Sequence, residues 1–106
     1  MIKIMLACSA GMSTSILVGK MRETAEKHGI KAEIWAIPES ELSSKIDTCD
    51  VLLLGPQVRF ILPRAEELAK PLGIPVEVID MKYYGVCNGA AVLKQALNMY
   101  KSNKKG

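Results

Sequence analysis

Aromatic residues and long apolar runs are both scarce in this sequence of 106 residues. Tryptophan, tyrosine and phenylalanine together make up 5% of it. No apolar stretch approaches the ~18–20 residues that a membrane-spanning helix needs, which argues against a membrane span. A basic stripe interleaved with aromatic side chains is also missing. A nucleic-acid-binding groove is therefore not expected.

Excess charge is small and sits at one end of the chain. Fourteen Lys and Arg against eleven Asp and Glu give a formal charge of +3, and Lys101, Lys104 and Lys105 account for three of the basic charges. The 49% of hydrophobic residues is enough for one core and excludes a disordered chain. The length is typical of a single domain. We expect this domain to span residues 1–101, followed by a basic tail, 102–106, that frays.

Disulfide pairing cannot use all three cysteines, because their number is odd. That count fits a reducing compartment such as the cytoplasm better than a disulfide framework. The run Met5-Leu6-Ala7-Cys8 is similar to the end of a bacterial lipoprotein signal, but only seven residues precede Cys8. A signal peptide needs ~15–30 residues. We therefore interpret this segment as part of the fold.

Strand and helix patterns alternate four times along the sequence. Short apolar or alternating runs predict strands at residues 2–7, 31–37, 51–54 and 76–79. Helical spacing predicts helices at residues 13–28, 39–46, 63–72 and 89–101, with an irregular loop at 80–87. Ser13 and Asn88 are candidate N-caps, and Gly29 is a candidate C-cap. The alternation predicts an α/β fold: a four-stranded parallel sheet of order 2-1-3-4 with helices on both faces.

The segment from Cys8 to Ser15 joins the first strand to the first helix. In such sheets ligands bind beyond the carboxyl ends of the strands, where Cys8 is expected to lie. Small residues and Gly11 allow backbone N–H groups to point inward as an anion-binding nest, and the helix adds its positive end. This field favours the thiolate, so Cys8 is a candidate nucleophile. The alternative for a lone cysteine is a buried structural role. The candidate phosphate-binding residues are Ser9, Ala10, Gly11, Met12, Ser13, Thr14 and Ser15.

An arginine is missing from this phosphate-binding loop (P-loop). The loop resembles that of low-molecular-weight tyrosine phosphatases, in which an arginine follows the cysteine by six residues. Here Thr14 occupies that position, and no basic residue occurs between Cys8 and Lys20. Such a guanidinium stabilises the transferred phosphoryl group and contributes ~10³–10⁵ in rate in other phosphoryl-transfer enzymes. A site without it is expected to accept a phosphoryl group but to hydrolyse it slowly, as a carrier does.

The whole chain resembles one family. It is similar to the IIB component of the lactose/cellobiose/chitobiose class of the bacterial sugar phosphotransferase system. The resemblance rests on the residues from Cys8 to Ser15, on Leu53-Leu54-Gly55-Pro56-Gln57, and on Val76-Glu77-Val78-Ile79-Asp80 with Tyr84-Gly85. It implies a fold like that of the low-molecular-weight tyrosine phosphatases.

The resemblance also implies a function and partners. Cys8 would accept a phosphoryl group from a phosphohistidine on the IIA protein. It would then transfer the group to a sugar, such as cellobiose, chitobiose or lactose, held by the membrane-embedded IIC component. The chain would be cytoplasmic and would meet the inner face of the membrane only through IIC. No cofactor and no metal are expected.

Three further residues are candidate accessory groups at the same sheet edge. Asp80 either orients a hydroxyl or acts as an acid near Cys8, or it only starts the following turn. Tyr84 either places its hydroxyl on the bound phosphate or packs in the core, and Tyr83 is a weaker candidate. Gln57 is a candidate for the surface that partners contact. His28 lies a full helix away from Cys8 and is interpreted as a solvated helix-end residue.

Alternative functions remain open from the residues alone. A thiol-redox enzyme could pair Cys8 with Cys87, because both follow carboxyl ends of strands, whereas Cys49 is expected at the opposite edge. A phosphatase is disfavoured by the missing arginine. A purely structural interaction domain would leave the Cys8 loop unexplained.

Overall fold

The four strands form one parallel sheet in the order β2-β1-β3-β4, as predicted. The structure is a computed structural model that describes residues 1–9 and 12–105. The strands are β1 (Ile2–Cys8), β2 (Ala32–Pro38), β3 (Val51–Leu54) and β4 (Val76–Val78). The α-helices are α1 (Met12–Lys27), α2 (Leu42–Lys45), α3 (Leu62–Ala69), α4 (Met81–Gly85) and α5 (Gly89–Lys105). Short 3₁₀ segments lie at Glu39–Glu41, Ile46–Thr48, Pro56–Ile61 and Lys70–Leu72.

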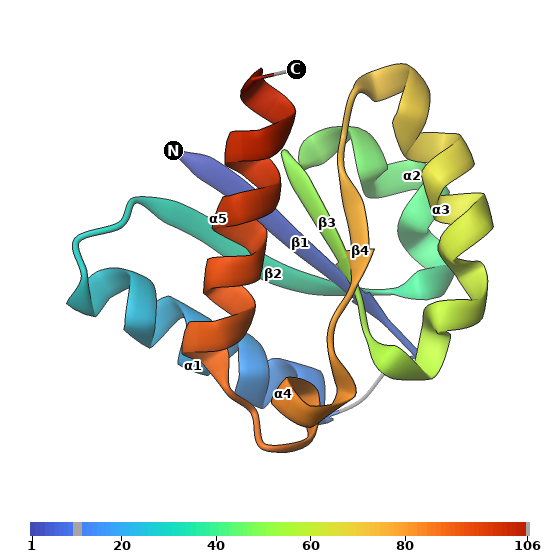
Figure 1. Cartoon of the computed structure of the whole chain (residues 1–106). Coiled ribbons are helices and arrows are strands. Elements are labelled where there is room, and N and C mark those ends of the chain that lie inside the picture. The colour runs from blue at the N-terminus through green and yellow to red at the C-terminus, as the bar shows by residue number, and fades with distance from the viewer. Residues whose placement is uncertain (10–11, 106) are drawn as a thin grey trace.

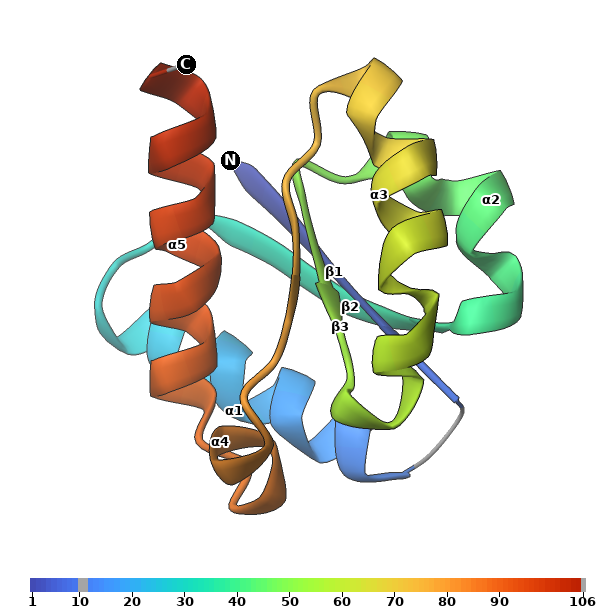
Figure 2. The ribbon, with the colours of Figure 1, turned by 45° about the vertical axis from the view of Figure 1, so that its right-hand side comes forward.

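Helices cover both faces of the sheet (Figures 1 and 2). On one face α1 and α5 pack on a core that includes Ile4, Leu6 and Leu53. On the other face α2 and α3 pack on a core that includes Met5 and Leu52. Strands β1 and β3 are thus buried on both sides. This explains why they appear in the sequence as continuous apolar runs.

Two of the three predicted helix caps are confirmed. Gly29 adopts a left-handed conformation (φ +67°) just after α1, and the Ile30 N–H donates to the Ala25 carbonyl at 2.8 Å. The Asn88 Oδ1 accepts from the Ala91 N–H at 3.1 Å at the start of α5. The prediction for Ser13 is wrong: α1 begins at Met12, so Ser13 lies in its first turn. A boundary difference of this size is usual, because helix ends fray and their assignment varies by one or two residues.

Helical structure extends further than predicted in two places. The predicted irregular loop at 80–87 contains α4, whose start is capped by Asp80: its Oδ1 accepts from the Lys82 N–H at 2.9 Å. Five residues are too few to show helical periodicity, so only the capping aspartate signals this helix. Helix α5 continues to Lys105, beyond the predicted boundary at residue 101. No glycine or proline interrupts it before Gly106, and lysines near a helix C-terminus are favourable.

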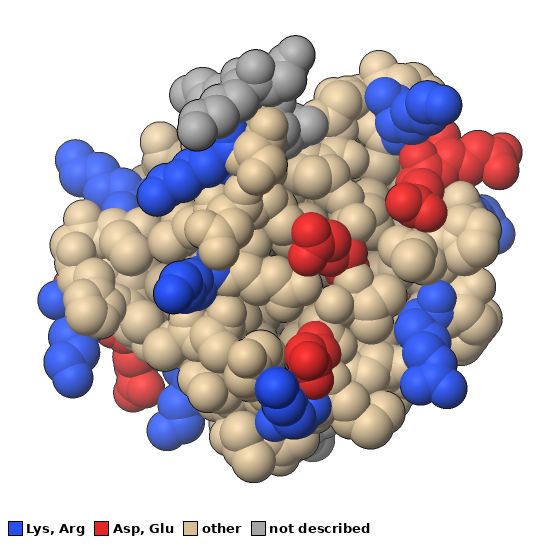
Figure 3. All heavy atoms as spheres, viewed as in Figure 1, with Lys and Arg blue, Asp and Glu red and all other residues tan. Residues whose placement is uncertain are grey.

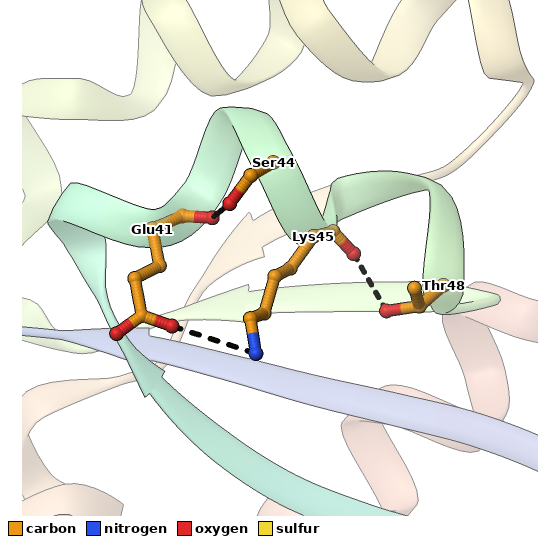
Figure 4. Close-up of polar contacts among 4 residues, drawn as sticks. All are labelled: Glu41, Ser44, Lys45 and Thr48. Atoms are coloured by element: carbon orange, nitrogen blue, oxygen red, sulfur yellow. Dashed lines mark hydrogen bonds and ion pairs between the residues drawn. The ribbon is translucent and has the colours of Figure 1, made fainter.

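The predicted helix at residues 39–46 is present as three consecutive pieces, of which α2 is the middle one. Three polar contacts hold this segment together (Figure 4). The Ser44 hydroxyl donates to the Glu41 carbonyl at 3.0 Å, and the Thr48 hydroxyl donates to the Lys45 carbonyl at 2.6 Å. Lys45 and Glu41 form an ion pair at 3.6 Å. These groups are exposed, so burial of Leu42 and Ile46 contributes more to anchoring the segment.

Both edges of the sheet are covered in part by side chains from the helices. On edge strand β2, the Arg22 guanidinium of α1 donates to the Ile34 carbonyl, from Nε at 2.8 Å. On edge strand β4, Gln95 of α5 donates from Nε2 to the Val78 carbonyl at 3.2 Å and to Glu77 Oε1 at 2.8 Å. Edge strands otherwise offer free backbone groups to other chains.

Candidate active site

Cys8 is the last residue of β1 and lies at the carboxyl end of the sheet, as predicted. Its side chain is 6% exposed, and its thiol donates a weak hydrogen bond to the Ile37 carbonyl at 3.8 Å. On the other side, the Gly55 N–H donates to the Ala7 carbonyl at 2.9 Å. Cys8 therefore lies between the ends of β2 and β3.

The predicted phosphate-binding loop is described only in part. Ala10 and Gly11 lie outside the described residues. Helix α1 begins at Met12, four residues after Cys8, so its positive end follows the cysteine closely in the chain. The first backbone N–H groups of a helix have no partner within it and are suited to bind anions. The role of residues 9–15 in holding a phosphate stays a prediction.

Thr14 and Tyr84 join the start of α1 to α4. The Thr14 Oγ1 and the Tyr84 hydroxyl oxygen are 2.8 Å apart, and the two residues are only 2% and 8% exposed. The position of the missing arginine is thus held by a buried hydroxyl that hydrogen-bonds to an aromatic residue 70 positions away. Tyr84 also belongs to the core beneath α1 and α5, so the packing alternative for it is confirmed. A contact between its hydroxyl and a phosphate stays a prediction.

The other two accessory candidates, Asp80 and Gln57, follow the carboxyl ends of β4 and β3. Asp80 is exposed and caps α4 through the Lys82 N–H, which confirms that it starts the following turn. Gln57 is exposed in the 3₁₀ segment that follows β3. Tyr83 is half-buried, with the Lys82 ammonium 5.3 Å from the centre of its ring. Gln57 Oε1 and Cys8 Cβ both lie within 4 Å of the position that a Cβ on Gly55 would occupy.

The three cysteines, all within the described part of the chain, are free thiols. Cys49 precedes β3, at the end of the sheet opposite Cys8, as predicted. Its thiol is buried and donates to the Ile46 carbonyl at 3.4 Å. Burial, assisted by the nearby negative charge of Asp50, raises the pKa of the Cys49 thiol to about 12. Cys49 is therefore inert as a nucleophile at neutral pH.

The raised pKa of Cys49 predicts a loss of stability in alkali. Below its ordinary pKa of 9.0 the thiol is neutral in both the folded and the unfolded chain. Above that pH the unfolded chain loses a proton that the folded chain keeps, so the free energy of unfolding falls as pH rises from 9 toward 12. Urea unfolding of the wild type at pH 8 and 10.5 should show a decrease about 1–2 kcal/mol larger than that of Cys49→Ala. Parallel pH profiles for the two proteins would contradict this.

Four large apolar side chains are exposed on segments that follow the carboxyl ends of the strands. We call this set the apolar rim: Ile16 (54% exposed), Phe60 (70%), Met81 (61%) and Val86 (74%). They lie on the first half of α1, on the segment after β3, and on or next to α4, which gather at the lower end of the sheet in Figure 1. Exposed apolar groups in one region are typical of a surface that other proteins contact. Sequence reasoning missed this set because its members are scattered along the chain.

No cluster of charges of one sign is seen on the one described face that Figure 3 shows. On the described part of the face that carries β4 and α5, acidic and basic side chains are interspersed (Figure 3). Among the described residues, no three His, Cys, Asp or Glu side chains are grouped so that they could hold a metal ion. No helix in the described ranges is long and apolar enough to cross a membrane.

Comparisons with known proteins agree on one family. Residues 3–95 match the family model described as the lactose/cellobiose-specific IIB subunit of the phosphotransferase system. The oligo-beta-mannoside-specific EIIB component of Bacillus subtilis is 44% identical over 97 residues, which cover 92% of this chain and 94% of that protein. The cellobiose-specific EIIB component of Lactococcus lactis is 42% identical over 101 residues, covering 91% and 94%.

Solved structures support the same assignment. The solution structure of the cellobiose-specific phosphotransferase IIB component from Borrelia burgdorferi superposes with a TM-score of 0.80 at 46% identity, covering 96% of this chain and 94% of that one. The lactose-specific IIB domain from Streptococcus pneumoniae shares the fold, with a TM-score of 0.81 at 20% identity and coverage of 93% and 97%. The architecture is thus of the low-molecular-weight phosphatase kind and differs from that of nucleotide-binding P-loop proteins. The chain belongs to the lactose/cellobiose-specific IIB family of the sugar phosphotransferase system, whose members are phosphotransferases.

Proposed function

We propose that this chain carries a phosphoryl group on Cys8, from a phosphohistidine of a IIA protein to a sugar bound by a membrane-embedded IIC protein. One observation carries the proposal, the arrangement around Cys8. Cys8 ends β1 four residues before α1 begins. Thr14, which is hydrogen-bonded to Tyr84, occupies the position where a phosphatase loop has its arginine. A thiolate at Cys8 is followed by the N-terminus of α1, which is expected to supply backbone donors, and by no basic residue before Lys20. This combination suits uptake of a phosphoryl group without rapid hydrolysis.

The transfer consists of two displacements at phosphorus. In the first, the Cys8 thiolate attacks the phosphorus, a P–S bond forms, and the P–N bond breaks with its electron pair left on the imidazole of IIA. In the second, a sugar hydroxyl oxygen attacks the same phosphorus. The P–S bond then breaks, the thiolate is restored, and the hydroxyl proton passes to a base on the sugar-binding partner. Each step needs close contact with a different protein.

The proposed sugar class is a β-linked disaccharide such as cellobiose, chitobiose or lactose. Relatives of this chain are named for oligo-beta-mannoside, cellobiose and galactose. Because Cys8 is only 6% exposed, we assign the choice of sugar to IIC. The transfer would take place at the inner face of the membrane.

A reconstitution assay tests this function. Phosphoenolpyruvate, the upstream phosphorylating proteins, a IIA protein and membranes containing IIC should form sugar phosphate only when this chain is added. Formation of sugar phosphate at the same rate without this chain would contradict the proposal. Rapid release of inorganic phosphate in the absence of sugar would instead support a phosphatase. Reversible Cys8–Cys87 crosslinking coupled to reduction of a substrate would support a redox enzyme.

The apolar rim is proposed as the surface that meets both partners. Phe60→Asp places a charge at the one aromatic residue of the rim, which is 70% exposed. We expect it to weaken IIA binding and slow sugar phosphorylation, each by about tenfold or more, without loss of stability. Titration with IIA and the reconstitution assay measure the two effects. Leu72→Asp is the matched control, because Leu72 is 49% exposed but precedes β4 at the opposite end of the sheet. Equal effects of the two variants would contradict a role for the rim.

A further inference from the structure

The side chain of Gln57 folds back across Gly55 toward Cys8. A methyl group at position 55 would lie 3.0 Å from Gln57 Oε1 and 3.6 Å from Cys8 Cβ. The carboxamide oxygen and the Cys8 side chain are therefore both neighbours of the same point beside the Gly55 backbone. Because Gly55 has no side chain, no side chain at position 55 lies between the Gln57 carboxamide and Cys8.

The backbone beneath Gln57 is held firmly in this position. The Gly55 N–H donates to the Ala7 carbonyl at 2.9 Å, and the Gly55 carbonyl accepts from the Val58 N–H at 3.0 Å. Pro56 begins the 3₁₀ segment and restricts the local backbone. Gly55, Pro56 and Val58 are buried, whereas Gln57 is exposed. The exposed carboxamide is thus attached to a buried, hydrogen-bonded backbone segment.

The two sides of Cys8 differ in hydrogen-bonding chemistry. On the β2 side, the Ile37 carbonyl accepts from the thiol at 3.8 Å. A carbonyl cannot donate, so this side repels the oxygens of a phosphoryl group. On the β3 side, the Gln57 carboxamide carries two N–H donors. A half-turn of its terminal amide group exchanges Nε2 and Oε1 and aims a donor at the site.

We infer that Gln57 binds the phosphoryl group carried by Cys8, donating from Nε2 to a phosphoryl oxygen on the β3 side. This inference rests on the function proposed above and adds a side-chain donor to the backbone donors of the loop. A neutral amide holds the group in line for transfer without the positive charge that an arginine would supply. Gln57 would therefore favour transfer between partners over attack by water.

Rates at saturating IIA test this inference. Gln57→Leu keeps the approximate size of the side chain and removes both donors. We expect it to lower the rate of phosphoryl uptake at saturating IIA by ~10-fold or more, because a hydrogen bond to a charged group is lost. Gln57→Glu should lower it further, since its carboxylate repels the phosphoryl oxygens. The affinity for IIA should stay within about twofold of wild type in Gln57→Leu.

A second readout reports on the bound group directly. The ³¹P NMR resonance of the phosphorylated wild-type chain should shift in Gln57→Leu and stay unchanged in Asn98→Leu, a control at an exposed amide on α5. Gly55→Ala, whose methyl would displace the carboxamide, should produce a shift as Gln57→Leu does. Circular dichroism should show that all variants are folded.

Three outcomes would overturn the inference. An unchanged saturating rate and an unchanged ³¹P resonance in Gln57→Leu would show that the amide does not touch the phosphoryl group. A rate loss that disappears at saturating IIA would make Gln57 a partner-contact residue only. If the wild-type chain takes up no phosphoryl group, the proposed function is overturned together with the inference. The first two outcomes, in contrast, overturn only the role of Gln57.

Discussion

Replacing Cys8 by serine is expected to reduce phosphoryl uptake to background while leaving the fold intact. The reaction needs a thiolate, and a serine hydroxyl stays protonated and is a far weaker nucleophile. The substitution is nearly isosteric, and the new hydroxyl can still donate to the Ile37 carbonyl that the thiol contacts at 3.8 Å. Intact mass spectrometry after incubation with phosphorylated IIA measures the stoichiometry, and thermal unfolding measures the fold.

Variants of the other two cysteines serve as controls. They distinguish loss of the Cys8 nucleophile from a general effect of replacing a cysteine. Cys87→Ser removes a half-buried free thiol and should accept one phosphoryl group as the wild type does. Cys49→Ala should also remain active, because Cys49 lies at the opposite end of the sheet. Phosphoryl uptake by Cys8→Ser at the wild-type level would rule out Cys8 as the acceptor.

Replacing Gly89 by alanine is expected to destabilise the protein by about 2–3 kcal/mol, because α1 and α5 are packed too closely for a side chain at this position. The added methyl would lie 2.5 Å from the Lys20 carbonyl carbon and 2.6 Å from the Met21 nitrogen. Both are backbone atoms of α1, so no rotation of a side chain relieves the clash. The two helices must separate. The midpoint of thermal unfolding should fall by ~10–20 °C.

Two other glycines provide controls for this prediction. Gly19 lies within α1, and a methyl there would meet nothing within 4 Å. Gly19→Ala should raise stability by about 0.5–1 kcal/mol, because alanine restricts the unfolded chain and favours the helix. Gly85→Ala, also in open space, should be close to neutral. A Gly89→Ala protein as stable as Gly85→Ala would show that the helices do not pack as closely as described.

Structural features that depend on residues close together in the sequence could be predicted. The run Val51–Leu54 is entirely apolar because both faces of β3 are covered, so its central place in the sheet was predictable. Gly29 was predictable as a cap because a left-handed residue after a helix is most often glycine. The position of Cys8 at the carboxyl end followed from the parallel topology.

Features that depend on distant residues could not be predicted. The hydrogen bond between Thr14 and Tyr84 joins residues 70 positions apart, and no local pattern pairs them. The close approach of Gly89 to Lys20 depends on how α5 crosses α1. Helix α4 is too short to show a period. The carboxamide of Gln57 comes near Cys8 only because β1 and β3 are neighbours in the folded sheet and Gly55 lies between them.

The location of the phosphoryl group on the wild-type chain tests the central claim most directly. The competing acceptor is His28, the single histidine, which lies just beyond the far end of α1. Phosphorothiolates and phosphohistidines resonate in different regions of the ³¹P spectrum, and peptide mass spectrometry places the group in the sequence. We predict one phosphoryl group with a phosphorothiolate resonance, on the peptide that contains Cys8. A phosphohistidine resonance on the peptide that contains His28 would contradict the account.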